Sequence, residues 1–290
     1  MSTALELDPS QELVEFWNEI LVPKCLQFRH IIVDGLTHHS AAIFPTLEVQ
    51  EGDAVLDIGC GFGDTAIELA QRVGPNGHVT GIDCCEAFLA IARKDSAAAG
   101  ITNVGFVEGD VQCYPFQPSY DFVFSRFGTM FFENPVRALR NIRTAMKPGA
   151  IMTMIVWRTI EDNPCLNLPK QVVLNFLPRP GEDARTCGPG PYSMADEETV
   201  IAMLRGAGFV DENFQRVDAP ILLGETVQAS VDFQLALGPA GEVFREAGDL
   251  AEQRREQIES ALKDAISPYL NEEGVAMASS SWVVTARNPR

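Results

Sequence analysis

The stretch VLDIGCGFGDTAIELA, from Val55 to Ala70, constrains the fold more than any other part of the chain. An apolar run meets Asp57, three glycines then alternate with other residues, and a helical pattern follows. Glycines let a chain turn tightly and let a ligand approach the backbone closely. Ligands of open parallel sheets lie beyond the carboxyl ends of the strands. We therefore expect a buried strand, a ligand-binding turn, and a helix beginning near Asp64 or Thr65, both suitable N-caps.

The same alternation of short apolar runs and helical stretches continues to Trp157. Strands are predicted at 54–59, 78–83, 104–110, 120–126 and 150–157, and the helical stretches between them are DTAIELAQRV, EAFLAIARKDSAAAG and NPVRALRNIRTAMKPG. Apolar strands separated by helices are typical of a mostly parallel sheet covered on both faces. Two more strands are expected, at 214–224 and 279–288. The sequence thus predicts a seven-stranded, Rossmann-like α/β fold.

The pattern divides the chain into four segments. Residues 1–48 are expected to form an N-terminal helical cover, and 49–225 the α/β core. A helical insertion or lid is predicted at 226–275, followed by a final core strand within 276–290. Within the core segment, the Pro- and Gly-rich residues 163–196 are expected to cross over the sheet or to act as a lid.

Charge and composition exclude several classes of partner. The 290 residues carry a net charge of −18 and the pI is about 4.6, so nucleic acids and anionic membranes are unfavourable partners. We find no apolar run of the roughly 20 residues that a membrane helix needs. The acidic N-terminus does not resemble a secretion signal, so a cytoplasmic location is expected. Seven cysteines without a C-x-x-C pair predict reduced thiols and neither a disulfide framework nor a zinc site.

The spacing of the glycines distinguishes between the classes of ligand that this turn could bind. A dinucleotide-binding turn has the pattern G-x-G-x-x-G, whereas Gly59, Gly61 and Gly63 give G-x-G-x-G. The chain has no G-x-x-x-x-G-K-[ST] phosphate-binding loop. Asp57 lies two residues before the first glycine, and a carboxylate there suits a cationic ligand better than a pyrophosphate.

VLDIGCGFG resembles the first motif of the class I S-adenosylmethionine-dependent methyltransferases. VTGIDCCEAFLAIAR and VEGDVQCYPF resemble the second and third motifs of that family. YDFVFSRFGTMFFENPVRALRNIRTAMKPG resembles the fourth strand and following helix of its ubiquinone-biosynthesis-like, or type 11, branch. The resemblance covers residues 50–160 well and the rest of the chain only in outline.

This resemblance implies S-adenosylmethionine as the cofactor and assigns its site. Asp83 would bind both ribose hydroxyls, and Asp110 would reach the adenine amine with help from the Val111 backbone. Such hydroxyls and amines need carboxylate acceptors. The further cofactor-binding candidates are Asp57, Gly59, Cys60, Gly61, Gly63, Cys84, Ser125 and Arg126, the last two near the methionine end. No metal ligand is predicted.

Catalytic candidates are few. A general base helps methyl transfer only where the acceptor holds its proton at neutral pH. His38 and His39 lie in the predicted N-terminal cover, which would fold over the pocket, but a structural role is an open alternative for each. Phe127, Met130, Phe131 and Phe132 are expected to line an apolar acceptor wall, with Trp17 and Trp157 at its rim.

The function expected from these residues is methyl transfer from S-adenosylmethionine to a small molecule. Two alternatives stay open: a nicotinamide-dependent oxidoreductase on the same type of core, and a cofactor-binding protein without catalysis. The clustered cysteines leave room for a thiol or metalloid acceptor, although small buried thiols are common. The identity of the acceptor atom is open, and a homodimer is possible.

Overall fold

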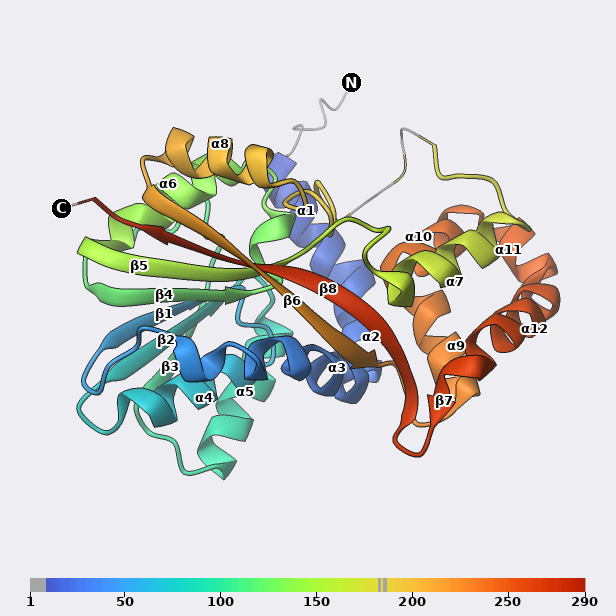
Figure 1. The fold of residues 1–290 in the computed structure, drawn as a ribbon, viewed down its shortest axis with the longest axis horizontal. Helices are drawn as coiled ribbons and strands as arrows, with labels where there is room; N and C mark the ends of the chain where they lie inside the picture. The colour runs from blue at the N-terminus through green and yellow to red at the C-terminus, as the bar shows by residue number, and fades with distance from the viewer. Residues whose placement is uncertain (1–8, 182–183, 185–186, 290) are drawn as a thin grey trace, which may run out of the picture.

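A twisted sheet forms the centre of the protein, and the computed structural model describes residues 9–181, 184 and 187–289. Its strands lie in the order β3-β2-β1-β4-β5-β8-β6 (Figure 1). Their bounds are β1 Ala54–Ile58, β2 His78–Asp83, β3 Val104–Glu108, β4 Tyr120–Arg126, β5 Met146–Trp157, β6 Val210–Leu222 and β8 Gly274–Arg287. A two-residue strand, β7 (Leu270–Asn271), pairs with the start of β8. The predicted seven-stranded, mostly parallel fold is confirmed.

Strand order reverses at β1. The chain runs from β1 to β2 and β3 on one side and then returns to place β4 on the other side, all parallel. Buried Val55, Leu56 and Ile58 explain why β1 occupies the centre, since a parallel strand covered on both faces needs apolar residues throughout. The carboxyl ends of β1 and β4 therefore flank the crevice where such sheets bind ligands.

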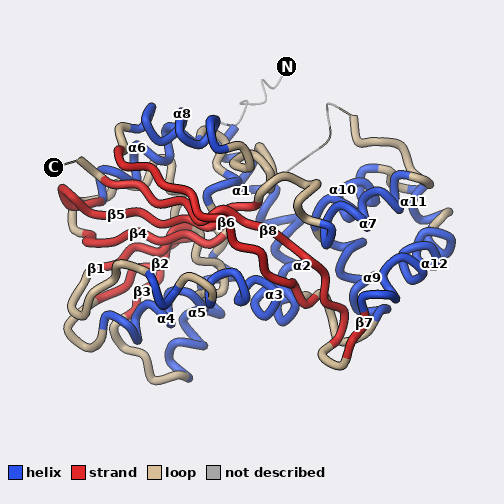
Figure 2. Tube along the Cα trace, viewed as in Figure 1, coloured by secondary structure: helices blue, strands red, loops and turns tan. Residues whose placement is uncertain are grey.

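Helices cover both faces of the sheet (Figures 1 and 2). On one face lie α3 (Arg29–Ala41), α4 (Asp64–Val73) and α5 (Glu86–Ala98), and on the other lie α6 (Pro135–Ala145) and α8 (Glu197–Ala207). Helix α6 ends before the predicted Pro-Gly stop, because residues 146–149 already belong to β5. A register shift between Tyr120 and Phe122 in the β4–β5 pair accommodates them.

A second group of helices packs beside one end of the sheet (Figure 1). It contains α7 (Pro164–Leu174), α9 (Val227–Ala236), α10 (Gly238–Glu246), α11 (Asp249–Gln253) and α12 (Arg255–Ile266). Helix α7 lies in the stretch predicted to cross over the sheet. It forms despite the internal Pro169 because Cys165 and Val173 are buried where α7 meets α10 and α12. The helical group thus draws on two separate parts of the chain.

The N-terminal helices lie between the sheet and this second group (Figure 1). They are α1 (Pro9–Phe16), a π-helical turn (Trp17–Leu21), α2 (Val22–Gln27) and α3, and a short 3-10 turn at Phe44–Thr46 follows them. Another 3-10 turn, Thr129–Phe131, follows β4. A last 3-10 turn, Ser267–Tyr269, precedes β7. Among the described residues, no helix is both long and apolar enough to cross a bilayer.

The glycine turn after β1 yields the first prediction. Gly63 and Gly61 both have positive φ, at 78° and 51°. A methyl group on Gly63 would lie 2.6 Å from the Ala92 Cβ and 2.9 Å from the Phe106 ring, whereas one on Gly61 would meet nothing within 4 Å. We expect Gly63→Ala to lower the free energy of unfolding by roughly 2–4 kcal/mol and Gly61→Ala by about 1 kcal/mol.

Urea unfolding of the two variants and the wild-type protein at one pH measures this difference. Gly61→Ala is the matched control, because it carries the backbone strain without the steric clash. Equal losses in the two variants would contradict the packing of Gly63 against α5.

Candidate functional site

A cavity of about 390 Å³ opens at the carboxyl ends of β1, β2 and β4. Its walls come from three regions: the turns after these strands, the N-terminal helices, and helices α9 and α10. Most of its lining surface is apolar. A cavity of this size at the reversal of strand order is suited to a small ligand or to two ligands that meet.

The glycine turn forms the floor beside β1. Gly59 and Cys60 donate backbone hydrogen bonds to the Ile82 carbonyl, at 2.9 and 3.1 Å, which ties the turn to the end of β2. Gly59, Cys60 and Gly61 line the cavity. A methyl group on Gly61 would project into open space, so this backbone is left bare toward the cavity. Gly63 does not line the cavity and instead occupies the N-cap of α4.

Asp83, at the end of β2, joins two turns. Its carboxylate accepts the Gly61 N–H at 2.9 Å and the Cys85 N–H at 3.0 Å. Burial raises its pKa, and these backbone donors counteract the rise. Hydrogen bonds from the Cys84 backbone and the Cys85 side chain lower the pKa as well. Asp83, Cys84 and Cys85 all line the cavity.

Asp57 lies behind the glycine turn and is fully buried. Its Oδ2 accepts the Thr65 hydroxyl at 2.7 Å, but its Oδ1 has no hydrogen-bond partner. Burial raises the pKa of Asp57 to about 7, and the Thr65 hydrogen bond opposes this rise. A buried carboxylate with an unused acceptor atom favours a positively charged neighbour over an anionic one.

The turn after β3 brings a third acid to the same cavity. Asp110 lines it together with Val111 and Gln112. The Asp110 Oδ1 accepts the backbone N–H of Gln112 at 2.9 Å, which fixes the direction of the carboxylate. The carboxyl ends of three neighbouring strands, β1, β2 and β3, therefore each carry an aspartate close to one cavity.

The two candidates from β4 are placed differently. Arg126 lines the cavity and forms an ion pair with Asp64 at 2.6 Å, while its other terminal nitrogen donates to the Ser40 hydroxyl at 3.2 Å. Ser125 is buried and does not line the cavity. Its hydroxyl donates to the Ile58 carbonyl at 2.8 Å. Ser125 thus supports the end of β1 from behind.

Neither His38 nor His39 lines the cavity. The ring of His39 is fully buried, and its two nitrogens lie 2.8 Å from the Ser281 hydroxyl and 2.7 Å from the Ser279 hydroxyl. Burial lowers its pKa to about 4, so the ring is neutral. His38 Nδ1 lies 2.8 Å from the Pro220 carbonyl. Both residues attach α3 to the β6–β8 pair, a geometry that favours their structural alternative over general-base catalysis.

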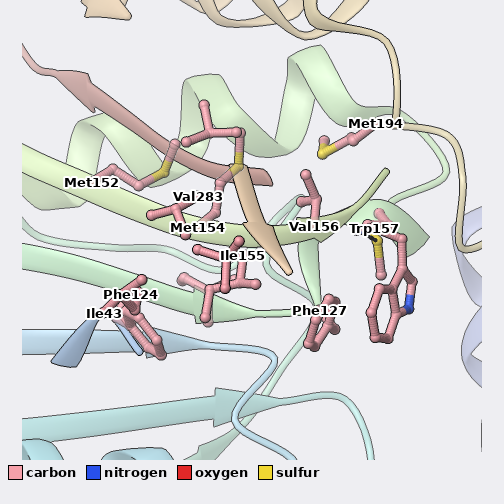
Figure 3. Close-up of a cluster of buried hydrophobic side chains, with 14 of the residues drawn as sticks. Ile43, Phe124, Phe127, Met152, Met154, Ile155, Val156, Trp157, Met194 and Val283 are labelled. Carbon is pink, nitrogen blue, oxygen red and sulfur yellow. Dashed lines mark hydrogen bonds between the residues drawn. The ribbon is translucent and has the colours of Figure 1, made fainter. Parts of the chain in front are cut away.

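An aromatic wall closes the cavity next to β4 and β5. Phe127 and Trp157 stack with ring centroids 4.0 Å apart, and the His39 ring meets both edge-on from behind. Figure 3 shows the two rings at one end of the buried side-chain cluster. Phe127 has a φ of 56°, rare for a non-glycine residue, and its N–H donates to the Ile155 carbonyl. Met130, Phe131, Phe132 and Trp17 also line the cavity, and their part in binding an acceptor stays a prediction.

The opposite wall was not predicted residue by residue. Helices α9 and α10 contribute Phe233, Leu237, Glu242 and Arg245. The Arg245 guanidinium lies 5.1 Å from the centre of the Phe16 ring on α1, so the two covering elements meet over the cavity. The only signal for this wall in the sequence was the helical insertion predicted at 226–275. The sequence of a helix does not show which of its faces will meet a distant segment of the chain.

Comparison with known proteins identifies one part of the chain. Residues 55–149 match the family model described as a methyltransferase domain. These residues extend from β1 into β5 and include the three strand-end aspartates.

Relatives extend the similarity at both the sequence and the structural level. The chain is 36% identical over 110 residues to a demethylmenaquinone methyltransferase of Listeria monocytogenes, across 38% of this chain and 46% of that protein. It therefore spans less than half of that relative's length. A Staphylococcus epidermidis protein of the same name is 27% identical over 181 residues, across 58% and 73% of the two chains.

Solved structures share the fold at lower identity. The YcgJ protein of Bacillus subtilis superposes with a TM-score of 0.56 at 17% identity, over 87% of this chain and 99% of that one. Phosphoethanolamine N-methyltransferase 2 of Haemonchus contortus gives a TM-score of 0.58 at 17% identity, over 96% and 60%. These likenesses support the architecture of the sheet and its helical covers.

Asp57 generates a prediction about stability and pH. Its folded pKa of about 7 exceeds the ordinary 3.8, so the folded protein binds more protons between these values and loses stability as pH rises through them. The Asp57→Asn variant has no ionising group at this position. From pH 5.5 to pH 8, the wild type should lose about 2 kcal/mol of unfolding free energy relative to Asp57→Asn. Urea unfolding of both proteins at the two pH values measures this change.

Subtracting the two proteins removes the contributions of other titrating groups. A difference between wild type and variant that stays constant from pH 5.5 to pH 8 would show that Asp57 does not have the raised pKa expected from its burial.

Proposed function

We propose that this chain, whose residues 55–149 match a methyltransferase domain, is a class I S-adenosylmethionine-dependent methyltransferase that transfers a methyl group from S-adenosylmethionine to a small, largely apolar acceptor. The observation that carries this proposal is a bare glycine turn that shares one cavity with Asp83 and Asp110, while Asp57 is buried directly behind the turn. That family uses S-adenosylmethionine as its methyl donor.

The residues around the turn fit this cofactor. Asp83 would accept hydrogen bonds from the ribose hydroxyls, and Asp110 with the Val111 backbone would bind the adenine. Gly59 and Gly61 would allow the cofactor to approach the backbone. The unpartnered Oδ1 of Asp57 leaves an unused acceptor atom behind the turn, which supports a cationic cofactor over a pyrophosphate. Arg126, already paired with Asp64, would border the methionine end.

When bound, the cofactor would supply a methyl group on a positively charged sulfur: the acceptor atom would bond to the methyl carbon in line as the carbon–sulfur bond breaks and the sulfur leaves as a neutral thioether. The protein's part is to hold the acceptor close and to exclude water, and such positioning can contribute as much as about 7–11 kcal/mol. The aromatic wall and the helices over the cavity serve this purpose. No histidine lines the cavity, although the structure describes all four. Proton removal by histidine is therefore not part of the proposal.

The lining of the cavity indicates the class of acceptor. The stacked pair Phe127 and Trp157, together with Phe131 and Phe233, presents ring faces and edges and few polar atoms. Flat apolar molecules bury well against such rings. The relatives named demethylmenaquinone methyltransferases are consistent with a ring-bearing acceptor. We propose an acceptor with an apolar ring and a single nucleophilic group.

Calorimetric titration with S-adenosylmethionine tests the cofactor half. We expect saturable binding to the wild type, and binding at least ~10-fold weaker in Asp83→Asn, because the amide loses charge-assisted hydrogen bonds worth roughly 1.5–3 kcal/mol each. Asp264→Ala is the matched control, since Asp264 is an exposed carboxylate on α12. Binding of NADH in place of S-adenosylmethionine would overturn the proposal in favour of an oxidoreductase.

Turnover with two kinds of acceptor tests the part of the proposal that concerns the acceptor. Mass spectrometry of the demethylated cofactor product should show turnover with hydroxylated apolar rings such as quinols and none with phosphoethanolamine, which is small and charged. Trp157→Ala should weaken turnover of the ring acceptor while leaving S-adenosylmethionine affinity within about twofold, because its ring lies on the acceptor wall. Methylation of phosphoethanolamine alone would contradict the apolar assignment.

A further inference from the structure

Thiols are concentrated at the cavity. The chain has seven cysteines, all described by the structure and none disulfide-bonded. Five of them line this single cavity: Cys25, Cys60, Cys84, Cys85 and Cys187. Methyl transfer as proposed above gives no role to a thiol side chain. Two of the five, Cys84 and Cys85, are adjacent in sequence and directly follow Asp83.

The spacing of these two thiols matches a metal-binding geometry. Their sulfur atoms lie 3.8 Å apart. A tetrahedral zinc ion with Zn–S bonds of about 2.3 Å separates two bound sulfurs by roughly 3.8 Å. One carboxylate oxygen of Asp83 and the two sulfurs all lie within 4.8 Å of one another. The two sulfurs and one oxygen are thus close enough together for a single ion to reach all three.

The three donor residues line the cavity. Cys84 is half-buried and Cys85 is buried, yet both form part of the cavity wall. Hydrogen bonds from the Gly61 and Cys85 N–H groups hold the Asp83 carboxylate in place beside the two thiols. Thiolates select soft or borderline ions such as Zn²⁺ and Cd²⁺ over Mg²⁺. The fourth position of a tetrahedral ion would face the cavity.

We propose that Cys84, Cys85 and Asp83 form a binding site for a thiophilic divalent ion such as Zn²⁺ or Cd²⁺, and that this ion and the cofactor exclude each other. On binding, each thiol releases its proton to solvent as its sulfur–metal bond forms. The exclusion rests on the proposed function, because it requires Asp83 to be the ribose acceptor as well. The metal site itself rests only on the geometry of the three side chains.

Titration of the reduced protein with Cd²⁺ tests the site, with the ultraviolet thiolate-to-cadmium absorption as readout. We expect one Cd²⁺ per chain, loss of the absorption in Cys84→Ser and in Cys85→Ser, and no change in Cys113→Ser, which alters an exposed thiol outside the cavity. Circular dichroism establishes that each variant is folded. Absorption that persists in both cavity variants, or a response to Mg²⁺, would overturn the site.

Addition of S-adenosylmethionine to the cadmium-loaded protein tests the exclusion. The absorption should fall as the cofactor displaces Cd²⁺, and the apparent Kd of the cofactor should rise with Cd²⁺ concentration. Unchanged absorption at a cofactor concentration that saturates the metal-free protein would refute the exclusion. Failure of the metal-free protein to bind the cofactor would instead count against the proposed function, and the cadmium titration would be unaffected.

Discussion

The site depends on one carboxylate that holds two turns together. Asp83 accepts N–H groups from Gly61, in the turn after β1, and from Cys85, at the start of α5. Parallel strands bring their carboxyl ends to one edge but do not fix the loops that follow. The Asp83 hydrogen bonds provide that fixation, so the bare backbone of the glycine turn faces the cavity. A carboxylate that orders the turn in this way is also placed to receive ligand.

The sheet and one half of the site could be predicted from sequence because their signals are local. Strands β1 and β4 are short apolar runs, Asp83 is the last residue of β2, and Asp110 lies two residues beyond the end of β3. Strand order then brings these acids to one edge without further information. Boundaries were less predictable: β5 begins four residues earlier than expected, since a register irregularity lets Pro148 enter the strand.

The part of the site formed by the covering helices could not be predicted, because it depends on contacts between segments that are distant in the sequence. His39 lies in the predicted N-terminal cover, but its partners Ser279 and Ser281 are about 240 residues away. No local pattern distinguishes a histidine bonded at both nitrogens from a catalytic one. Likewise α7 contains Pro169 in a Pro-rich stretch, and its helical form depends on packing against α10 and α12.

The position of the helical group in the chain has an evolutionary consequence. Helices α9 to α12 are inserted between β6 and β8, which are neighbouring antiparallel strands at the edge of the sheet. A segment joining two adjacent strands can be exchanged for another without rethreading the ladder or disturbing β1 to β4. The wall that α9 and α10 contribute to the cavity can therefore change while the strand-end aspartates of β1 to β3 stay in place. One core can in this way acquire new chemistry through replacement of a single connection.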